Sequence, residues 1–251
     1  MRGRKSNRDW YAEGFTLVEI LIAMAVASLL VVSLLSIVST SMDVSKKANA
    51  VMFSKSSAQA ALDLMVTDLD SLLVSRNAGE VLLFNNGELT NSSLSMLTTS
   101  MEDSYSTDGS SSPGLPRMVQ YVIKYETNFA SSSKSYGLYR GVMDPTQTFS
   151  NVIGSTLSTT PTNPLLLVPN VVRMNMNIYT NYGTGVWNSV FSINSSNLPP
   201  GVVVEVALTV LDEPYIQRFG NGLGSGNNSA TNLIRQYGRT LIRRVSLPSP
   251  L

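Results

Sequence analysis

An apolar stretch from Gly14 to Val38 constrains the fold of this chain more than any other feature. After Gly14 the sequence reads Phe-Thr-Leu-Val-Glu and then continues with apolar and small residues. A helix needs about 20 mostly apolar residues to cross the hydrocarbon core of a bilayer, so this stretch can span a membrane. Its one charged residue is Glu19, and a charge inside a span costs about 2.5–3.5 kcal/mol on insertion scales. We therefore expect Glu19 to need a partner from outside this helix.

A basic segment precedes the apolar stretch and indicates how the chain is oriented in the membrane. It contains Arg2, Arg4, Lys5 and Arg8. Because basic residues are retained on the cytoplasmic side, this segment is expected in the cytoplasm and the remainder of the chain outside it. The margin is modest, since three lysines follow the span on the other side: Lys46, Lys47 and Lys55.

The hexapeptide Gly14-Phe15-Thr16-Leu17-Val18-Glu19 resembles the cleavage and methylation motif of type IV prepilins and type II secretion pseudopilins. This resemblance implies that a prepilin peptidase/methyltransferase cuts between Gly14 and Phe15 and methylates the new amine of Phe15. It also implies that Glu19, as the fifth mature residue, is the assembly glutamate. The resemblance carried by this motif covers only the N-terminal part of the chain.

The chemistry of these residues agrees with that resemblance. Gly14 has no Cβ, which leaves its backbone accessible to a protease. Cleavage would create a positive amine one helical turn before Glu19, and residues four apart share a helix face. The alternative is an uncleaved signal anchor with Glu19 at headgroup level. A cleaved secretory signal is disfavoured because the apolar run is too long and no small-x-small site follows it.

Three segments follow from these features: residues 1–14 as leader, residues 15–40 as transmembrane and assembly helix, and residues 41–251 as a periplasmic domain. The chain has no cysteine and no histidine, which removes Ser-His-Asp and Cys-His catalysis and the commonest zinc sites. Its net charge is +1, so the chain lacks a basic field for nucleic acid. We expect no enzyme activity, no catalytic residues, no metal and no cofactor.

The N-terminal helix is expected to continue far beyond the span, because no Pro or Gly occurs between Phe15 and Ala78. The sequence predicts one helix from Phe15 to about Leu73, with Asn77-Ala78-Gly79 ending it. Its second half carries an apolar stripe at helical spacing, formed by Val51, Ala58, Leu62, Met65, Leu69 and Leu72. This predicts an α+β, pilin-like fold. Its long helix is transmembrane in the first half and amphipathic in the second, where it packs on an antiparallel β-sheet domain.

Short β-rich runs separated by turn residues fill the rest of the chain. The expected strands are Val81–Phe84, Leu94–Leu97, Arg117–Glu126, Tyr136–Met143, Leu165–Val168, Val171–Tyr179, Val186–Ile193, Val202–Leu211 and Arg239–Leu247. Asn86-Gly87 is a hairpin signal, and residues 181–185 are typical of a turn. The Val202–Leu211 run is apolar on both faces except at Glu205 and Thr209, so we expect it to be a central strand.

Long polar segments are predicted as loops at 100–116, 144–164 and 220–232. The first contains Glu102, Asp103 and Asp108, and such carboxylates suit calcium. Their spacing does not match an EF-hand, however, so a solvated loop is the favoured interpretation. Asp212 and Glu213 are adjacent carboxylates at a strand end, which is typical of a solvated turn.

A second, more diffuse resemblance is to minor pseudopilin J of type II secretion. It rests on Leu166–Val171, the alternating run to Tyr179, the later Gly183, Gly185 and Trp187, Leu198-Pro199 before a Val-rich strand, Gly137–Arg140 and Arg243-Arg244-Val245. The loops exceed what that family implies, so a lineage-specific prepilin of Verru_Chthon cassette type stays open.

Three classes of function are compatible with the sequence, and the first is favoured. It is a structural subunit of a pilin-like filament or its tip, held in the inner membrane and contacting lipid and other pseudopilins or pilins. The second is an anchored binding module, such as an adhesin-like minor pilin. An anchored enzyme ranks last, since no constellation supplies a nucleophile with its base. Neither nucleic acid nor a small-molecule substrate is indicated.

Overall fold

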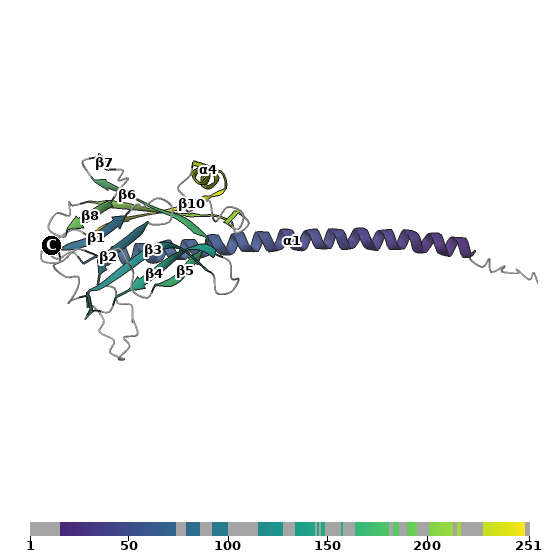
Figure 1. Ribbon diagram of the computed structural model, residues 1–251, viewed down its shortest axis with the longest axis horizontal. Helices are drawn as coiled ribbons and strands as arrows, with labels where there is room; N and C mark the ends of the chain where they lie inside the picture. Colours follow the sequence, from purple (N-terminus) through teal and green to yellow (C-terminus); the bar gives the residue numbers. More distant parts are fainter. Residues whose placement is uncertain are drawn as a thin grey trace, which may run out of the picture. The chain divides into compact units, whose positions relative to one another are not determined.

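The chain forms two compact units, Met1–Asn49 and Ala50–Leu251. Figure 1 shows the elements of the computed structural model in chain order. The structure describes residues 16–73, 79–85, 92–99, 115–127, 134–143, 145, 147–148, 157, 164–180, 183–185, 190–194, 201–212, 215–216 and 228–248.

The long helix predicted from the sequence is confirmed as α1 (Leu17–Asp70). All residues from Thr16 to Ala50 are exposed. Burial begins at Ser54 and then recurs at helical spacing on one face, at Ala58, Ala61, Leu62, Met65, Asp68 and Leu69. The predicted apolar stripe is therefore the buried face of the second half, although Val51 is only half-buried.

The helix ends three residues before the predicted Leu73. The backbone at Ser71–Leu73 pairs with a strand instead of continuing the helical ladder. Leu72 forms an isolated bridge with Thr98, and the Leu73 amide donates to the Leu97 carbonyl at 2.8 Å. A strand edge therefore competes successfully for the last helical amides.

A six-stranded antiparallel sheet contains most of the predicted strands, in the order β5-β4-β3-β2-β1-β8. These strands are β5 (Leu165–Pro169), β4 (Lys134–Val142), β3 (Arg117–Thr127), β2 (Ser93–Thr98), β1 (Glu80–Asn85) and β8 (Val190–Asn194). Along β3, Val119, Tyr121 and Ile123 are all buried, and so are the intervening Met118 and Gln120. The run predicted over 186–193 forms a described strand only from Val190.

A four-stranded antiparallel sheet has the order β10-β9-β6-β7. Its strands are β10 (Arg239–Ser246), β9 (Val203–Val210), β6 (Val171–Thr180) and β7 (Gly183–Gly185). β9 lies between two neighbours and is buried along nearly its whole length, which confirms it as a central strand. The turn predicted at 181–185 is wrong for Gly183–Gly185, because these residues pair with the end of β6.

The chain passes from one sheet to the other at Pro169-Asn170. β5 ends at Pro169 in the six-stranded sheet, and β6 begins at Val171 in the four-stranded sheet. Asn170 has a φ of 65°, a left-handed conformation in which asparagine is enriched among non-glycine residues. Its amide donates to the Tyr136 carbonyl at 2.7 Å, and its carbonyl accepts from the Leu211 amide at 3.0 Å. The corner is thus fixed to strands of both sheets.

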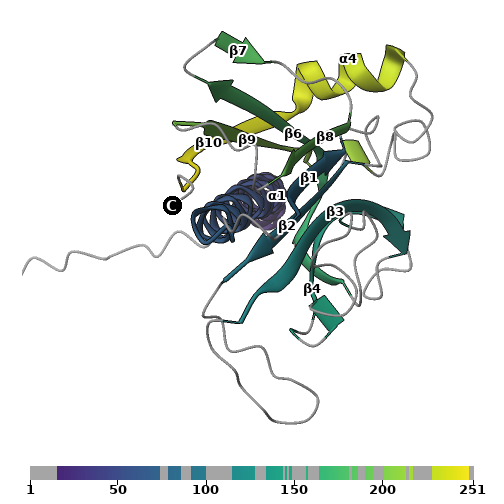
Figure 2. The same cartoon turned by 90° about the vertical axis from the view of Figure 1, so that its left-hand side faces the viewer.

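The core lies where the second half of α1 meets both sheets. Figure 2, viewed along α1, shows β9 and β10 on one side of the helix and β2 on the other. One continuous cluster of buried residues includes Leu62 and Met65 of α1, Phe84 of β1, Tyr121 of β3 and Val206 of β9. The antiparallel β-sheet domain predicted under the helix thus consists of two sheets.

The loop predicted at 220–232 is wrong at its C-terminal end, where helix α4 (Asn228–Tyr237) begins. α4 leads directly into β10 through Gly238, where an added Cβ would clash with the Ile234 carbonyl oxygen. The surface loop predicted at 144–164 also needs correction, because Thr148 and Leu157 are buried. The 102–108 acidic cluster and the Asn86-Gly87 turn lie outside the described residues.

Candidate processing and assembly segment

The N-terminus of α1 carries a reciprocal cap formed by Thr16 and Glu19. The Thr16 amide and hydroxyl donate to Glu19 Oε2 at 2.9 and 3.0 Å, and the Glu19 amide donates to Thr16 Oγ1 at 3.2 Å. This is a capping box, in which two side chains satisfy amides that the first helical turn leaves free. The Thr-x-x-Glu spacing is the sequence signal for this cap, and it was not among the features predicted above.

The capping box corrects the expectation that Glu19 has no partner within its own segment. Both of its hydrogen bonds involve Oε2, while Oε1 accepts no hydrogen bond from any described residue. The cap supplies hydrogen bonds but no positive charge. Glu19 therefore keeps one oxygen, and its full charge, available for a cation from outside. The predicted processing residues Gly14 and Phe15 lie outside the described residues.

The apolar half of α1 offers a shallow surface of small side chains beside Glu19. A hollow is lined by Glu19, Ile20, Ala23, Met24 and Ala27. α1 contains an 18-residue window with mean hydropathy 2.8, none of which is buried in the structure. By length and composition this helix can cross a membrane. Small residues let another helix approach closely, so the same surface suits lipid or a second helix.

A buried ionic cluster, missed in the sequence, fixes α1 to the six-stranded sheet. Asp68 of α1 is 1% exposed and accepts hydrogen bonds from Tyr121 of β3 and Arg140 of β4. Arg140 Nη2 lies 3.1 Å from Asp68 Oδ2. Burial, followed by the charge of Asp68, raises the pKa of Tyr121 far above its ordinary value, so Tyr121 stays a proton donor.

A second cluster lies on the four-stranded sheet around Glu205 of β9. Its carboxylate accepts hydrogen bonds from Arg244 Nε at 2.7 Å and from Asn177 Nδ2 at 2.9 Å, with the Tyr179 hydroxyl at 3.3 Å. These donors, Asn177 first and then Arg244, lower the pKa of Glu205 below its ordinary value. These hydrogen bonds join β9 to its neighbours β6 and β10.

Of the two adjacent carboxylates assigned to a solvated turn, Asp212 forms an ion pair. Asp212 pairs with Arg239 at 3.6 Å, and its carbonyl accepts from the Tyr215 amide at 3.0 Å. Glu213 lies outside the described residues. Among the residues that the structure describes, no group of three carboxylates could hold a metal ion.

Comparison with known proteins identifies the N-terminal segment. Residues 11–40 match the family model described as the prokaryotic N-terminal methylation motif. A search of curated proteins finds no match. The solved structures include the type IV-like pilin TTHA1219 from Thermus thermophilus, with a TM-score of 0.42 and 12% identity. That alignment covers 77% of this chain and 95% of the pilin.

The chain thus carries a prokaryotic N-terminal methylation motif at residues 11–40. Behind that motif lies a long N-terminal helix whose second half packs on antiparallel sheets.

Proposed function

We propose that this protein is a minor pseudopilin or pilin-like structural subunit of a type II secretion pseudopilus. In this proposal a prepilin peptidase removes residues 1–14, and residues 15–40 hold the chain in the inner membrane. Residues 41–251 then form the periplasmic domain, and the subunit joins other pseudopilins in the filament or at its tip. The methylation motif at residues 11–40 is the single observation that carries the proposal.

The mechanism follows from Glu19 and the exposed apolar half of α1. Before assembly this half contacts lipid, and in a filament it contacts the helices of neighbouring subunits. Cleavage at Gly14 makes Phe15 the first residue and gives it a positive amine. Glu19 Oε2 continues to cap its own helix, while Oε1 accepts a hydrogen bond from the Phe15 amine of a neighbour. The pairing offsets the cost of a charge in an apolar environment.

The test separates the charge of Glu19 from its capping role. Glu19→Gln keeps the capping box, since glutamine also serves at this position, but removes the charge. Glu19→Ala removes both. We expect both variants to insert, to be cleaved after Gly14 by intact mass, and to lose crosslinks to partner pilins that the wild type forms. Insertion should improve, because about 2.5–3.5 kcal/mol of burden is removed.

The outcomes distinguish the alternatives. Full crosslinking by Glu19→Gln would show that the carboxylate charge has no role in assembly. An intact N-terminus at Met1 in cells with active prepilin peptidase would contradict processing itself. Mass spectrometry of the crosslinked wild-type protein identifies its partner proteins and so the filament to which it belongs. Secretion pseudopilins as partners support the proposal, whereas surface pilins or other large prepilins would favour a minor type IV pilin or a Verru_Chthon-type protein with an adhesive role.

A further inference from the structure

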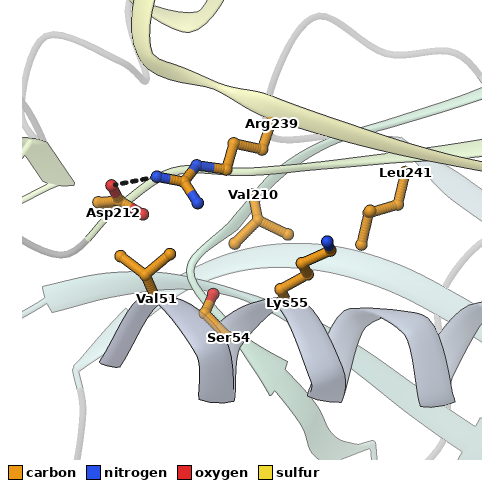
Figure 3. Close-up of a pocket in the computed structure, with 7 residues that line it drawn as sticks. All are labelled: Val51, Ser54, Lys55, Val210, Asp212, Arg239 and Leu241. Atoms are coloured by element: carbon orange, nitrogen blue, oxygen red, sulfur yellow. Dashed lines mark ion pairs between the residues drawn. The ribbon is translucent and has the colours of Figure 1, made fainter. Parts of the chain in front are cut away.

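A small cavity lies between α1 and the strands β9 and β10 (Figure 3). Its residues are distant in sequence from the methylation motif that carries the proposed function. Its volume is about 230 Å³. Pockets for drug-sized ligands typically enclose roughly 300–1,000 Å³, so this one suits a smaller group. Three aliphatic side chains line it: Val51 of α1, Val210 of β9 and Leu241 of β10. The occupant therefore has a short apolar body.

A buried hydroxyl without a partner also lines the cavity. Ser54 is 8% exposed, and its Oγ has no hydrogen-bond partner among the residues that the structure describes. Figure 3 shows this oxygen pointing from the helix toward the strands, between the side chains of Val51 and Lys55. Buried polar atoms are nearly always hydrogen-bonded, and leaving one unpaired costs about 1–3 kcal/mol. A ligand with a hydrogen-bonding group would supply the missing partner.

The charges around the cavity favour an anion. Lys55 forms no ion pair with any residue that the structure describes, and in Figure 3 its side chain extends toward Val210 and Leu241. Arg239 and Asp212 pair with each other at 3.6 Å. The cavity lining thus contains two cations, Lys55 and Arg239, and one carboxylate, Asp212, which leaves one net positive charge. Lysine supplies three donors and no acceptor, so the complementary group is a hydrogen-bond acceptor.

We propose that this cavity binds a small aliphatic carboxylate. The stem packs against Val51, Val210 and Leu241, and the carboxylate accepts hydrogen bonds from the Lys55 ammonium and the Ser54 hydroxyl. This site goes beyond the role of a filament subunit, because it would give the domain a ligand of its own. The binding test does not depend on processing or assembly.

The probe is hexanoate bearing a terminal trifluoromethyl group. Fluorine NMR measures its binding to the full-length protein in nanodiscs, and the signal change caused by empty nanodiscs is subtracted. We expect saturable binding in excess of the empty nanodiscs. The corresponding hexylammonium should not bind, because Lys55 and Arg239 repel it. Absence of saturable hexanoate binding, or equal binding of the ammonium, would overturn the proposal.

Variants locate the binding. Lys55→Met keeps the aliphatic stem and should weaken hexanoate binding roughly tenfold, as expected for loss of a charge-assisted hydrogen bond. Lys46→Met, at an exposed lysine that does not line the cavity, is the matched control and should bind like the wild type. Val51→Trp should abolish binding by filling the cavity. Unchanged affinity in Lys55→Met would overturn the proposal whether or not Val51→Trp folds, because Lys55 is exposed and its replacement leaves the core intact.

Discussion

At the scale of single residues, two aspartates on α1 show how burial decides the value of an ion pair. Asp68 pairs with Arg140, and their side chains are 1% and 13% exposed. Asp63 pairs with Arg243 at 2.9 Å, but these side chains are 62% and 46% exposed. Water screens the Asp63–Arg243 pair and competes for its hydrogen bonds. The Asp68–Arg140 pair is buried, so water cannot replace one partner when the other is removed. The two distances are similar, so distance alone does not predict the contribution to stability.

We therefore predict different outcomes for the same substitution at the two positions. Asp68→Asn leaves Arg140 without its counter-charge and should lower the free energy of unfolding by about 3–5 kcal/mol. Asp63→Asn is the matched control and should cost less than about 1 kcal/mol. Chemical denaturation of both variants measures the difference. Equal stabilities would show that the Asp68 cluster does not hold the helix to the sheet.

Glu205 gives a prediction about pH. Because its pKa is lowered in the folded chain, the folded state binds a proton less readily than the unfolded state. The contribution of Glu205 to stability is therefore present above the ordinary pKa of 4.5 and lost as the pH falls through the lowered value. Glu205→Gln should cost about 1.5 kcal/mol at neutral pH. Measured by acid unfolding, the difference in free energy of unfolding between Glu205→Gln and wild type should vanish at low pH. A difference independent of pH would contradict the role given to the Glu205 charge.

The sequence singles out individual residues only where a local pattern marks them. Glu19 belongs to a contiguous hexapeptide, which is readable without any structure. Asp68 shares the helical spacing of the apolar stripe, three residues after Met65, yet its partners Tyr121 and Arg140 are 53 and 72 residues away in the chain. Pairing across such separations depends on strand register, which no local pattern of this chain specifies.

At the scale of elements, α1 and the longer strands could be predicted because periodicity and the absence of breakers act locally. α4 was missed because its surroundings are rich in Gly, Asn and Ser, which are typical of loops. Asn228 at its start and Gly238 just after its end were the available boundary signals. β7 was missed for another reason: its three residues, Gly-Thr-Gly, form a strand only because the end of β6 offers a partner.

The buried face of α1 predicts a strong effect at Leu62, which is 1% exposed. Leu62→Asp places an unpaired charge in the core and should prevent cooperative folding, since such burial costs several kcal/mol. Ala60→Asp, at an exposed position on the same helix, should cost less than about 1 kcal/mol. Thermal unfolding of the two variants compares them. A cooperative transition of Leu62→Asp near the wild-type temperature would show that this face is not core.

At the scale of the whole molecule, the sequence predicted a helix on a sheet but not the division of the strands between two sheets. That division depends on the corner at Pro169-Asn170, where one residue with a φ of 65° redirects the chain. The sequence indicates that a strand ends there, but it does not indicate to which sheet the next strand belongs. The core then forms among residues distant in sequence, all of them within the unit Ala50–Leu251.

That unit should fold without the N-terminal segment. Every described residue before Ala50 is exposed, and most of the large exposed apolar side chains lie there, among them Leu17, Leu29 and Ile37. Deleting residues 1–42 removes most of this apolar surface and none of the buried cluster. The truncated protein should be soluble without detergent and unfold cooperatively. Deleting residues 1–14 alone is the matched control, and this variant should still require detergent because it keeps the apolar helix. Aggregation or gradual melting of the 1–42 deletion would mean that the first half of α1 contributes to folding of the domain. The whole of α1 would then fold as one cooperative element with the core, and its first half would be more than an anchor.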